Sequence, residues 1–509
     1  MTFSLWHQPW LPVRRDGRIE HIGLASLFRH AHLIEDLAVP QPPAAEGVLR
    51  ILLAITVRVA GLDRLSDEDW PEERLDLLEA GSFDNDAINA YASTHASASA
   101  DRFDLFHPQQ PFLQDPRLAE QCPKSSGINK MMIARASGNN QPWFDGHHRD
   151  ADPVAVPPAE AALALIAQYF YGPSGRCTSR QVGAVKEANT MAGPLRTTIA
   201  YHPVGRNLFQ TLLVGLAAPS PWASGEEDLC PWERDDLPDP LAVPRPVAGY
   251  RSMLTARAHH SLLLVPDAEH ESVVDAYLTW GTRARNLPVE DPYLIIQVAK
   301  DGNLYTRQAD ASRALFRDVD ALLLQTRPTS TARQPLIFHN CAEHLSKEFS
   351  RGLRVRAYGF DQDGQTRDKQ WFSAITPPVL GLLEHHDPVA AVGVRVLREA
   401  AELAASRLGF ALKQAWRAYS SPSGGGPAGK VPDGPWPARA AADYWALAEQ
   451  EFWTSVRDAD FDAPARRFVL LALGVYDGVT ATTRAQPRGA RACEGARGLL
   501  ISVMTKEAA

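Results

Sequence analysis

Residues 351–383 read RGLRVRAYGFDQDGQTRDKQWFSAITPPVLGLL, and the change of pattern within this stretch decides the fold. The first nine residues alternate as a strand does, and a polar, turn-prone run follows at 360–371. On its own, such a run is typical of a surface loop. After Pro377 and Pro378 the sequence turns helical, and only helical patterns follow. The stretch therefore ends one kind of domain and begins another.

Beyond Pro378, four segments have apolar residues at helical spacing. A loop rich in Ser, Gly and Pro separates the first two, and shorter breaks separate the others. Four helices joined in this way are the layout of a four-helix bundle, so we predict one over residues 378–509. The segments are 391–419, 440–459, 463–482 and 490–508.

Upstream, over residues 1–377, strand and helix patterns are mixed. Asp-Gly pairs join two pairs of alternating segments and predict hairpins. Seven prolines between Leu216 and Gly249 exclude a regular element there. Because the elements do not strictly alternate, we predict an α+β fold, with a large mixed N-terminal domain before the bundle. The predicted elements are strand pairs at 10–24 and 291–308, a strand at 259–267, and helices at 47–62 and 159–172.

Charge limits the class of function. The chain has 509 residues, a net charge of −8 and a pI near 6.1. A protein that coats nucleic acid indiscriminately needs excess Lys and Arg, so any nucleic-acid site here must be local. Between Ala161 and Phe209 the cations outnumber a single acid, Glu187, and further cations punctuate the preceding Gly-, Ser- and Asn-rich loop. The cations are Arg176, Arg180, Lys186, Arg196 and Arg206, preceded by Lys124, Lys130 and Arg135. This basic island favours an anionic partner.

Cysteine usage and hydropathy indicate the compartment. The five cysteines are far apart and form no CxxC pair, which suits a reducing cytoplasm and gives no zinc signature. Neither a signal peptide nor an apolar run of membrane-spanning length is recognisable. We therefore expect a cytoplasmic protein without a membrane partner.

Catalytic motifs are absent from the sequence. There is no HExxH spacing, no GxSxG elbow and no Walker A loop. One alternative stays open, a metal-dependent hydrolase that uses His147, His148 and Asp150 with His107. A second is a purely structural adaptor built on the helical bundle. We predict a protein that is not an enzyme and holds neither a cofactor nor a metal.

Taken in order, several short motifs resemble one family. The motifs are WLPV (10–13), HPQQPFLQ (107–114), INKMMIARASGNN (128–140) with FDGHH (144–148), AEAALALIAQYFYGPSG (159–175), AGPLRTT (192–198), HPVGRNLFQTLL (202–213), PWERDD (231–236), GYRSMLTARAH (249–259) and RAYGFDQDGQTRDKQW (356–371). This order is similar to that in CasA proteins, the large subunits of the type I-E CRISPR Cascade complex. The helical C-terminus agrees with the resemblance, which spans nearly the whole chain.

The resemblance implies a non-catalytic subunit of an RNA-guided surveillance complex. CasA-like proteins recognise a protospacer-adjacent motif in double-stranded DNA, help to open the duplex and form a platform for a recruited helicase-nuclease. The expected partners are therefore the other Cascade subunits, the guide RNA, the target DNA and that helicase-nuclease. Base pairing with the guide reads the rest of the target in such systems.

The resemblance also assigns residues. The glycine loop of the family falls on YGPSGR, so Gly172 and Gly175, with Arg176 beside them, are expected at the minor groove of the motif. The family's wedge, a β-hairpin tip, falls on FDQDGQ. Its expected residues are Gln362 first, Gln365 second, and the neighbouring Asp361.

Two further expectations concern a loop and an insertion. The loop at 129–140 corresponds to the segment that reaches the guide's 5′ handle and neighbouring subunits, with Asn129 and Lys130 as the expected contacts. Some relatives carry a cysteine-rich insertion with a motif-contacting lysine; here 268–286 has neither residue type, so we expect no zinc. Either Arg283 or Arg285 takes the place of that lysine, or the contact is missing.

Overall fold

The structure is a computed structural model that describes residues 2–97, 100–135, 148–218, 227–284, 290–325, 332–364, 367–420 and 433–501. The chain divides into two compact units. The first consists of Met1–Ala311 and Arg327–Gly381, and the second of Ser312–Thr326 and Leu382–Ala509. The chain therefore enters the second unit twice, first at Ser312, before the 351–383 stretch, and again at Leu382, at the end of that stretch.

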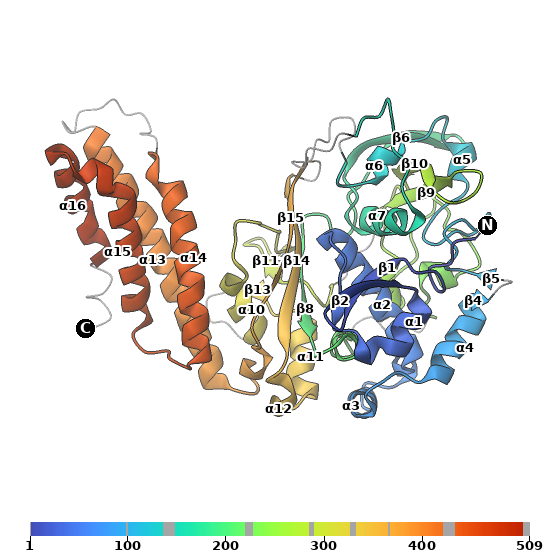
Figure 1. Cartoon of the computed structure of the whole chain (residues 1–509), viewed down its shortest axis with the longest axis horizontal. Helices are drawn as coiled ribbons and strands as arrows, with labels where there is room; N and C mark the ends of the chain where they lie inside the picture. Colours follow the sequence, from blue (N-terminus) through green and yellow to red (C-terminus); the bar gives the residue numbers. More distant parts are fainter. Residues whose placement is uncertain are drawn as a thin grey trace. The chain divides into compact units, whose positions relative to one another are not determined.

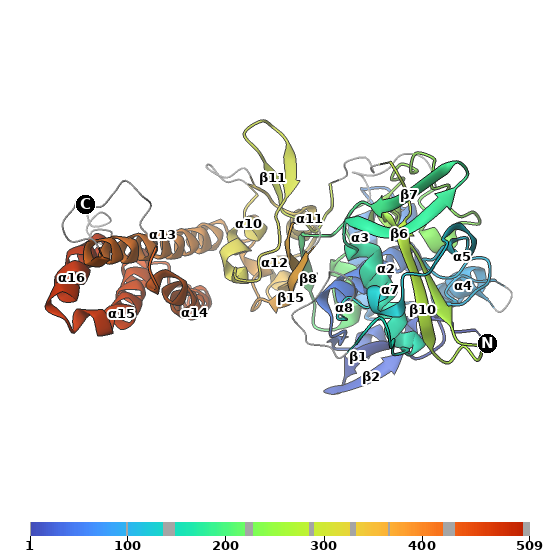
Figure 2. The ribbon, with the colours of Figure 1, turned by 90° about the horizontal axis from the view of Figure 1, so that it is seen from above.

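The first unit mixes helices with small sheets (Figures 1 and 2). Its helices are α1 (Leu24–His30), α2 (Pro42–Val59), α3 (Trp70–Ala80), α4 (Asn85–His95), α5 (Leu118–Gln121), α6 (Ile128–Met131), α7 (Pro158–Tyr171), α8 (Leu208–Val214), α9 (Tyr250–Thr255), α11 (Leu336–His344) and α12 (Lys347–Ser350). Its strands are β1 (Leu11–Arg15), β2 (Arg18–Ile22), β3 (Asp36–Leu37), β4 (Ala96–Ser97), β5 (Ala100–Asp101), β6 (Gly175–Val182), β7 (Val185–Thr190), β8 (Ile199–Val204), β9 (His260–Pro266), β10 (Val273–Trp280), β11 (Ile296–Val298), β12 (Leu304–Thr306), β13 (Ala332–Arg333), β14 (Arg354–Asp363) and β15 (Arg367–Ile375). All strand pairs in the described ranges are antiparallel.

Helix α2 is the centre of this unit. Every residue from Pro42 to Val59 except Arg58 is buried, as expected for a helix that is apolar on nearly all sides. It packs against α7, α9 and β14, so it supports both the helix that leads into YGPSGR and the strand that leads into FDQDGQ. Two charged residues, Glu46 and Arg50, lie within this core and are paired with each other.

The 351–383 stretch forms the hairpin β14–β15, which joins β8 in a three-stranded sheet of order β15-β14-β8 (Figure 1). Asp363 pairs with Arg367, and Gly364 has φ +65°, a value that glycine adopts without strain. A bulge between Asp361 and Gln362 shifts the register just before the tip. The sequence also predicted a helix directly after the two prolines. Only a short 3₁₀ helix forms there, at Leu380–Leu382, and the next α-helix begins at Pro388.

In the described part of the second unit, helices predominate: α10 (Val319–Leu323), α13 (Pro388–Ser420), α14 (Trp436–Arg457), α15 (Pro464–Arg484) and α16 (Pro487–Ile501). Helix α13 packs against α14, α15 and α16. Buried tyrosines tie these helices together, since the hydroxyl of Tyr444 donates to the Ala401 carbonyl (2.8 Å) and that of Tyr476 to the Cys493 carbonyl (2.7 Å). The α+β fold with C-terminal helices is therefore confirmed. None of the helices in the described ranges is both long and apolar enough to cross a membrane.

Candidate nucleic-acid interface

The first glycine of YGPSGR is buried. Gly172 ends α7, and its N–H donates to the carbonyl of Gln168 at 2.9 Å. A Cβ at this position would lie 2.6 Å both from that carbonyl oxygen and from Cε1 of His260. Such distances are far inside van der Waals contact, so the Gln168 carbonyl and His260 leave no room for a side chain at this position. Gly172 is therefore needed for the internal packing of the loop, independently of any contact that the loop makes with a partner.

The second glycine and the arginine lie nearer the surface. Gly175 has φ +107°, in the region where side chains are strained, and it opens β6 opposite Thr190. The next residue, Arg176, is exposed and pairs through its backbone with Asn189. Its guanidinium forms no ion pair with any described residue. Arg176 thus gives the predicted loop a cationic group that no described acidic residue neutralises.

The side chain of His260 supports the glycine loop through a hydrogen bond. Its Nε2 lies 3.0 Å from the carbonyl of Pro173, to which it donates. Burial lowers the pKa of His260 to about 4, although the Pro173 carbonyl opposes this shift. The positive charges of Arg196 and Lys130 lower the pKa further. The imidazole is therefore neutral at physiological pH.

This pKa makes loop packing sensitive to acid. The unfolded chain, in which histidine has a pKa of about 6.5, binds a proton in the window between about 6.5 and 4, whereas folded His260 does not. Stability must therefore fall as the pH is lowered through this window, by about 3 kcal/mol at pH 4. Unfolding of wild type and His260→Gln, compared at pH 7 and pH 4, measures this contribution. We expect the variant to lose less stability on acidification; an equal loss would contradict the assignment.

Helix α6 lies beside the loop. The side-chain amide of Gln168 in α7 donates to the carbonyls of Lys130 (3.1 Å) and Met131 (3.0 Å). Lys130 is half-buried. Burial lowers its pKa, and the nearby Cys177 of β6 opposes that shift. The structure thus brings Lys130, Cys177 and the adjacent Arg176 into one neighbourhood.

Asn129 is buried, with 1% of its surface exposed. Its Nδ2 donates to Asp150 at 3.2 Å, and its Oδ1 accepts from Arg135 at 3.3 Å. Its amide is therefore engaged inside the protein and holds the start of the loop. Residues 136–147, which include the rest of the predicted guide-handle segment, lie outside the described residues.

At the hairpin, the predicted wedge residue has an unusual environment. Both amide atoms of Gln362 are shielded from solvent, and neither has a hydrogen-bond partner among the described residues. Buried amides are normally paired, because an unpaired one costs free energy. Asp361 is engaged: its carboxylate accepts from the N–H of Ala311 (3.2 Å) and lies 3.6 Å from the Lys369 ammonium. Gln365 lies outside the described residues.

Of the two arginines expected to replace the family's lysine, Arg283 lies within the described residues. Arg283 follows β10, and its guanidinium lies 3.1 Å from the carboxylate of Glu187 in β7, with both side chains partly exposed. An exposed pair of this kind is weak, so Arg283 remains available to an anion that competes with Glu187. Arg285 lies outside the described residues.

The basic island is not one surface, and this prediction needs a correction. Arg180 and Arg196 are buried. Arg180 donates to Asp115 at 2.7 Å, and Arg196 is paired with Asp368. A count of charges along the chain cannot separate cations that neutralise buried acids from cations that face solvent. The exposed members of the island are Lys124, Arg176, Lys186 and Arg206.

The metal-hydrolase alternative gains no support. Nδ1 of His107 accepts from the backbone N–H groups of Gln109 (3.2 Å) and Gln110 (3.0 Å), and Asp150 accepts from Asn129. Among the described residues, no group of three His, Cys, Asp or Glu side chains is placed to hold a metal ion. His148 is described, but His147 is not.

Comparison with known proteins decides the family. The model of the family described as CRISPR-associated protein Cse1 matches residues 4–473. This chain belongs to the Cse1 family. A curated relative, CRISPR-associated protein CasA/Cse1 of Thermus thermophilus, is 30% identical over 327 residues, which are 63% of this chain and 60% of that protein. The resemblance to CasA is thus confirmed.

Solved structures of similar proteins agree. A chain from a structure described as a CRISPR RNA-guided surveillance complex is 40% identical, with a TM-score of 0.88 over 98% of this chain and 99% of that one. Thermobifida fusca Cse1 is 20% identical, with a TM-score of 0.79 over 99% and 98% of the two chains. At that identity the second match supports the fold alone.

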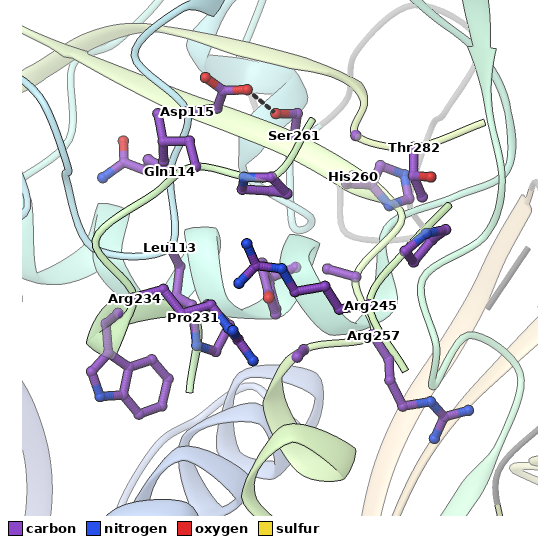
Figure 3. A pocket seen from close by; sticks show the side chains of 18 of the residues that line it. Leu113, Gln114, Asp115, Pro231, Arg234, Arg245, Arg257, His260, Ser261 and Thr282 are labelled. Carbon is purple, nitrogen blue, oxygen red and sulfur yellow. Dashed lines mark hydrogen bonds between the residues drawn. The ribbon is translucent and has the colours of Figure 1, made fainter. Parts of the chain in front are cut away.

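A cavity of about 300 Å³ lies next to the loop in this Cse1 protein (Figure 3). The Pro-rich segment forms one wall and contributes Arg234 and Arg245, while Trp232 and Tyr169 line it with apolar surface. His260 also lines the cavity, and its Nε2 donates to the Pro173 carbonyl, so this side chain contacts both the cavity and the glycine loop. The lining residues are scattered over some 180 positions, from Arg102 to Thr282, so sequence motifs gave no sign of the cavity.

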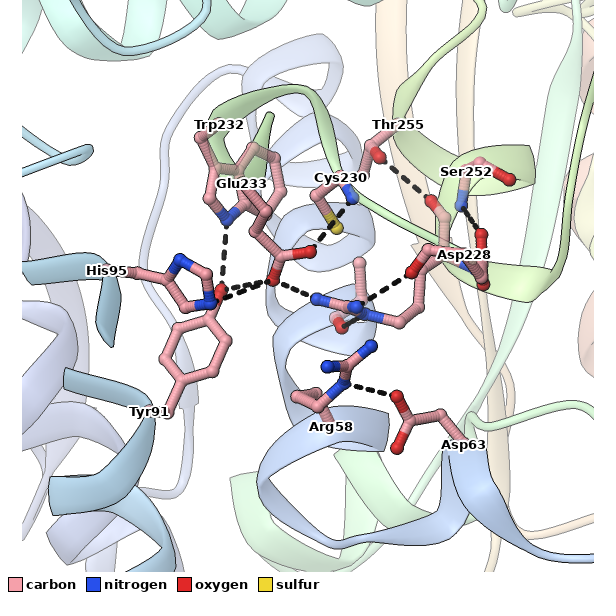
Figure 4. Close-up of polar contacts among 12 residues, drawn as sticks. Arg58, Asp63, Tyr91, His95, Asp228, Cys230, Trp232, Glu233, Ser252 and Thr255 are labelled. Carbon is pink, nitrogen blue, oxygen red and sulfur yellow. Dashed lines mark hydrogen bonds and ion pairs between the residues drawn. The ribbon is translucent and has the colours of Figure 1, made fainter. Parts of the chain in front are cut away.

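Two family motifs act together to hold this Pro-rich wall (Figure 4). Glu233 of PWERDD is paired with Arg251 of GYRSMLTARAH, and both side chains are buried. Tyr91 donates to Glu233 at 2.9 Å, and the backbone N–H of Arg251 donates to Asp228 at 2.7 Å. These Cse1 motifs are therefore structural: they fasten a segment that has little regular structure of its own.

Proposed function

We propose that this protein is the large subunit of a type I-E CRISPR RNA-guided surveillance complex. In that role it recognises the protospacer-adjacent motif in double-stranded DNA, helps to open the duplex and provides the platform for the recruited helicase-nuclease, without catalysis of its own. Membership of the Cse1 family and 40% identity to a chain of such a complex support the assignment. The partners are then the other subunits, the guide RNA and the target DNA.

The observation that carries the DNA-reading part is the unpaired amide at the hairpin. Gln362 lies two residues before the turn glycine, and neither of its amide atoms is paired within the described protein. Such a group gains hydrogen bonds or stacking when an unpaired base reaches it. Separating the first base step costs a few kcal/mol in proteins that wedge DNA. Pairing with the guide offsets this cost, because the heteroduplex is about as stable as the DNA duplex it replaces.

The glycine loop supplies the motif contacts. Gly175 allows close backbone approach, and Arg176 offers a free cation to the minor groove or its phosphates. The minor groove distinguishes base pairs poorly, so several motif sequences should be tolerated. Lys130, in the same neighbourhood, would meet a phosphate of the motif or of the guide handle. Arg283 would join when DNA displaces Glu187.

The decisive experiment uses the reconstituted complex. Strand opening next to the motif is followed by 2-aminopurine fluorescence on targets with and without the motif, in wild type, Gln362→Ala and Gln370→Ala. Gln370 is an exposed glutamine on the other strand of the same hairpin and serves as the matched control. We expect Gln362→Ala to slow motif-dependent opening about tenfold, equivalent to about 1.4 kcal/mol, and Gln370→Ala to have no effect.

Salt must be identical throughout, because phosphate contacts make affinity strongly salt-dependent. Guide loading should be equal in all three proteins. If wild-type opening does not depend on the motif, the DNA-reading function is wrong. Binding to the partner subunits without any contribution to DNA binding would instead support a structural adaptor.

A further inference from the structure

Arg196 lies between the glycine loop and the hairpin and contacts both. Its Nη1 donates to the carbonyl of Tyr171, the last residue of α7, at 2.7 Å. Its Nη2 donates to Asp368 in β15. The guanidinium carbon also lies 5.1 Å from the ring centre of Phe360 in β14, close enough for a cation–π contact. One side chain thus connects the residue before Gly172 to both strands of the hairpin.

The backbone on either side of Arg196 also connects the glycine loop to the sheet of the hairpin. The N–H of Gly193 donates to the Gly172 carbonyl (2.9 Å), and that of Leu195 donates to the Phe170 carbonyl (3.0 Å). A Cβ on Gly193 would lie 2.5 Å from the Phe170 oxygen, so glycine is required for this close approach. From Ile199 the chain becomes β8, which pairs with β14. The AGPLRTT motif is therefore bound to the loop at one end and leads into the hairpin's sheet at the other.

Burial makes this connection stiff. The Arg196 side chain is 1% exposed and that of Asp368 is 8% exposed. Burial lowers the pKa of Arg196, and the carboxylate of Asp368 opposes that shift, as expected for a pair whose charges compensate each other inside the protein. If Asp368 moved into water, the buried guanidinium of Arg196 would lose the carboxylate that compensates it.

The connection ends next to the wedge. In the antiparallel register, Asp368 lies directly opposite Gln362. Opposed residues of a strand pair have neighbouring side chains, so the position of Asp368 bears on that of the unpaired amide. Tyr171, Arg196 and Asp368 therefore form a continuous chain of contacts from the loop to the residue opposite Gln362.

We infer that Arg196, through Asp368, is a positioning residue that couples the motif-reading loop to the wedge hairpin. The inference rests on the proposed function and adds a division of roles to it. Gly175 and Arg176 contact the motif, and Gln362 enters the duplex. The pair Arg196–Asp368 fixes the position of the hairpin relative to the glycine loop. Breaking the pair should separate recognition from opening.

The test uses Asp368→Asn and Arg196→Lys in the reconstituted complex, with three DNA substrates. The first carries the motif but no guide complementarity and reports motif binding alone. The second is a full target and reports opening. The third is the same target with the base pairs next to the motif mismatched, so that no wedge is needed. We expect motif binding within twofold of wild type, opening slowed about tenfold on the second substrate, and near wild-type rates on the third.

Asp36→Asn is the control, because it weakens another Arg–Asp pair, Arg356–Asp36 (2.7 Å), which is partly exposed and lies at the other end of the hairpin strand, away from the loop. It should open targets normally. If Asp368 acts through the side-chain amide of Gln362, the double variant Asp368→Asn/Gln362→Ala should open targets no more slowly than the slower of the two single variants.

Different failures have different meanings. Wild-type opening by Asp368→Asn and Arg196→Lys, with slow opening by Gln362→Ala, would overturn the coupling and leave the proposed function intact. Slow reaction of the variants on the mismatched target would also overturn it, since it would indicate a general structural defect. Opening by wild type that ignores the motif would overturn the proposed function itself.

Discussion

Replacing Arg50 with alanine is expected to destabilise the first unit by about 3–5 kcal/mol. Arg50 donates from Nε to Glu46 at 2.6 Å and from Nη1 to Asp291 at 2.7 Å. All three side chains are at most 3% exposed. Alanine would remove the cation nearest to both buried carboxylates. Asp291 would keep Arg257, at 3.8 Å, and Glu46 would keep His202, at 2.7 Å. Desolvation makes such poorly compensated buried charges costly. Because α2 supports both α7 and β14, the loss would reach the candidate site as well.

Chemical denaturation of the purified protein, followed by tryptophan fluorescence, measures this loss. Arg50→Met is the companion variant, since it keeps most of the volume and still removes the charge. Arg15→Ala is the surface control: Arg15 lies 3.7 Å from Glu20 with both side chains partly exposed, so a change of at most about 1 kcal/mol is expected. Equal destabilisation by Arg50→Ala and Arg15→Ala would show that the buried network does not stabilise the fold.

Much of the fold could be predicted because local signals and tertiary structure agree. Asp-Gly turns marked the hairpins at 16–17 and 301–302, and Gly17 and Gly302 do have positive φ. The apolar run of α2 was recognised because it is buried on nearly all sides. The hairpin β6–β7 was missed, since its burial pattern does not alternate and much of its surface is exposed. Edge hairpins of this kind depend on packing, here against β10, which local sequence does not reveal.

The site was predictable in part, and for a different reason. Motif order placed the loop and the hairpin, but not the roles within them. Arg196 was counted in the basic island expected to favour an anionic partner, although it is buried and binds Asp368. Asn129 was expected to face a partner, although its amide is engaged internally. Both depend on residues distant in the sequence, and pairing over such separations cannot be read from charge or spacing alone.

A second buried arginine should behave in the opposite way to Arg50. Arg74 in α3 has no exposed surface, and no described carboxylate is paired with it. Its Nε and Nη2 have no hydrogen-bond partner in the described part of the chain, and Nη1 reaches the Leu216 carbonyl only at 3.5 Å. Its guanidinium carbon lies 4.6 Å from the ring centre of Trp70. Burial lowers the pKa of Arg74 to about 10, which shows how poorly the site compensates the charge.

Arg74→Met is therefore expected to stabilise the protein by about 1–3 kcal/mol, because it removes an uncompensated cation and fills the same space. The cation–π contact with Trp70 that would be lost is worth about 2 kcal/mol or more at a buried site, which is less than the several kcal/mol that desolvation of the guanidinium costs. The same substitution at Arg50 is the matched control, and denaturation of both variants should give changes of opposite sign. Destabilisation by both would mean that Arg74 has a compensating partner and that its site is built to hold a charge.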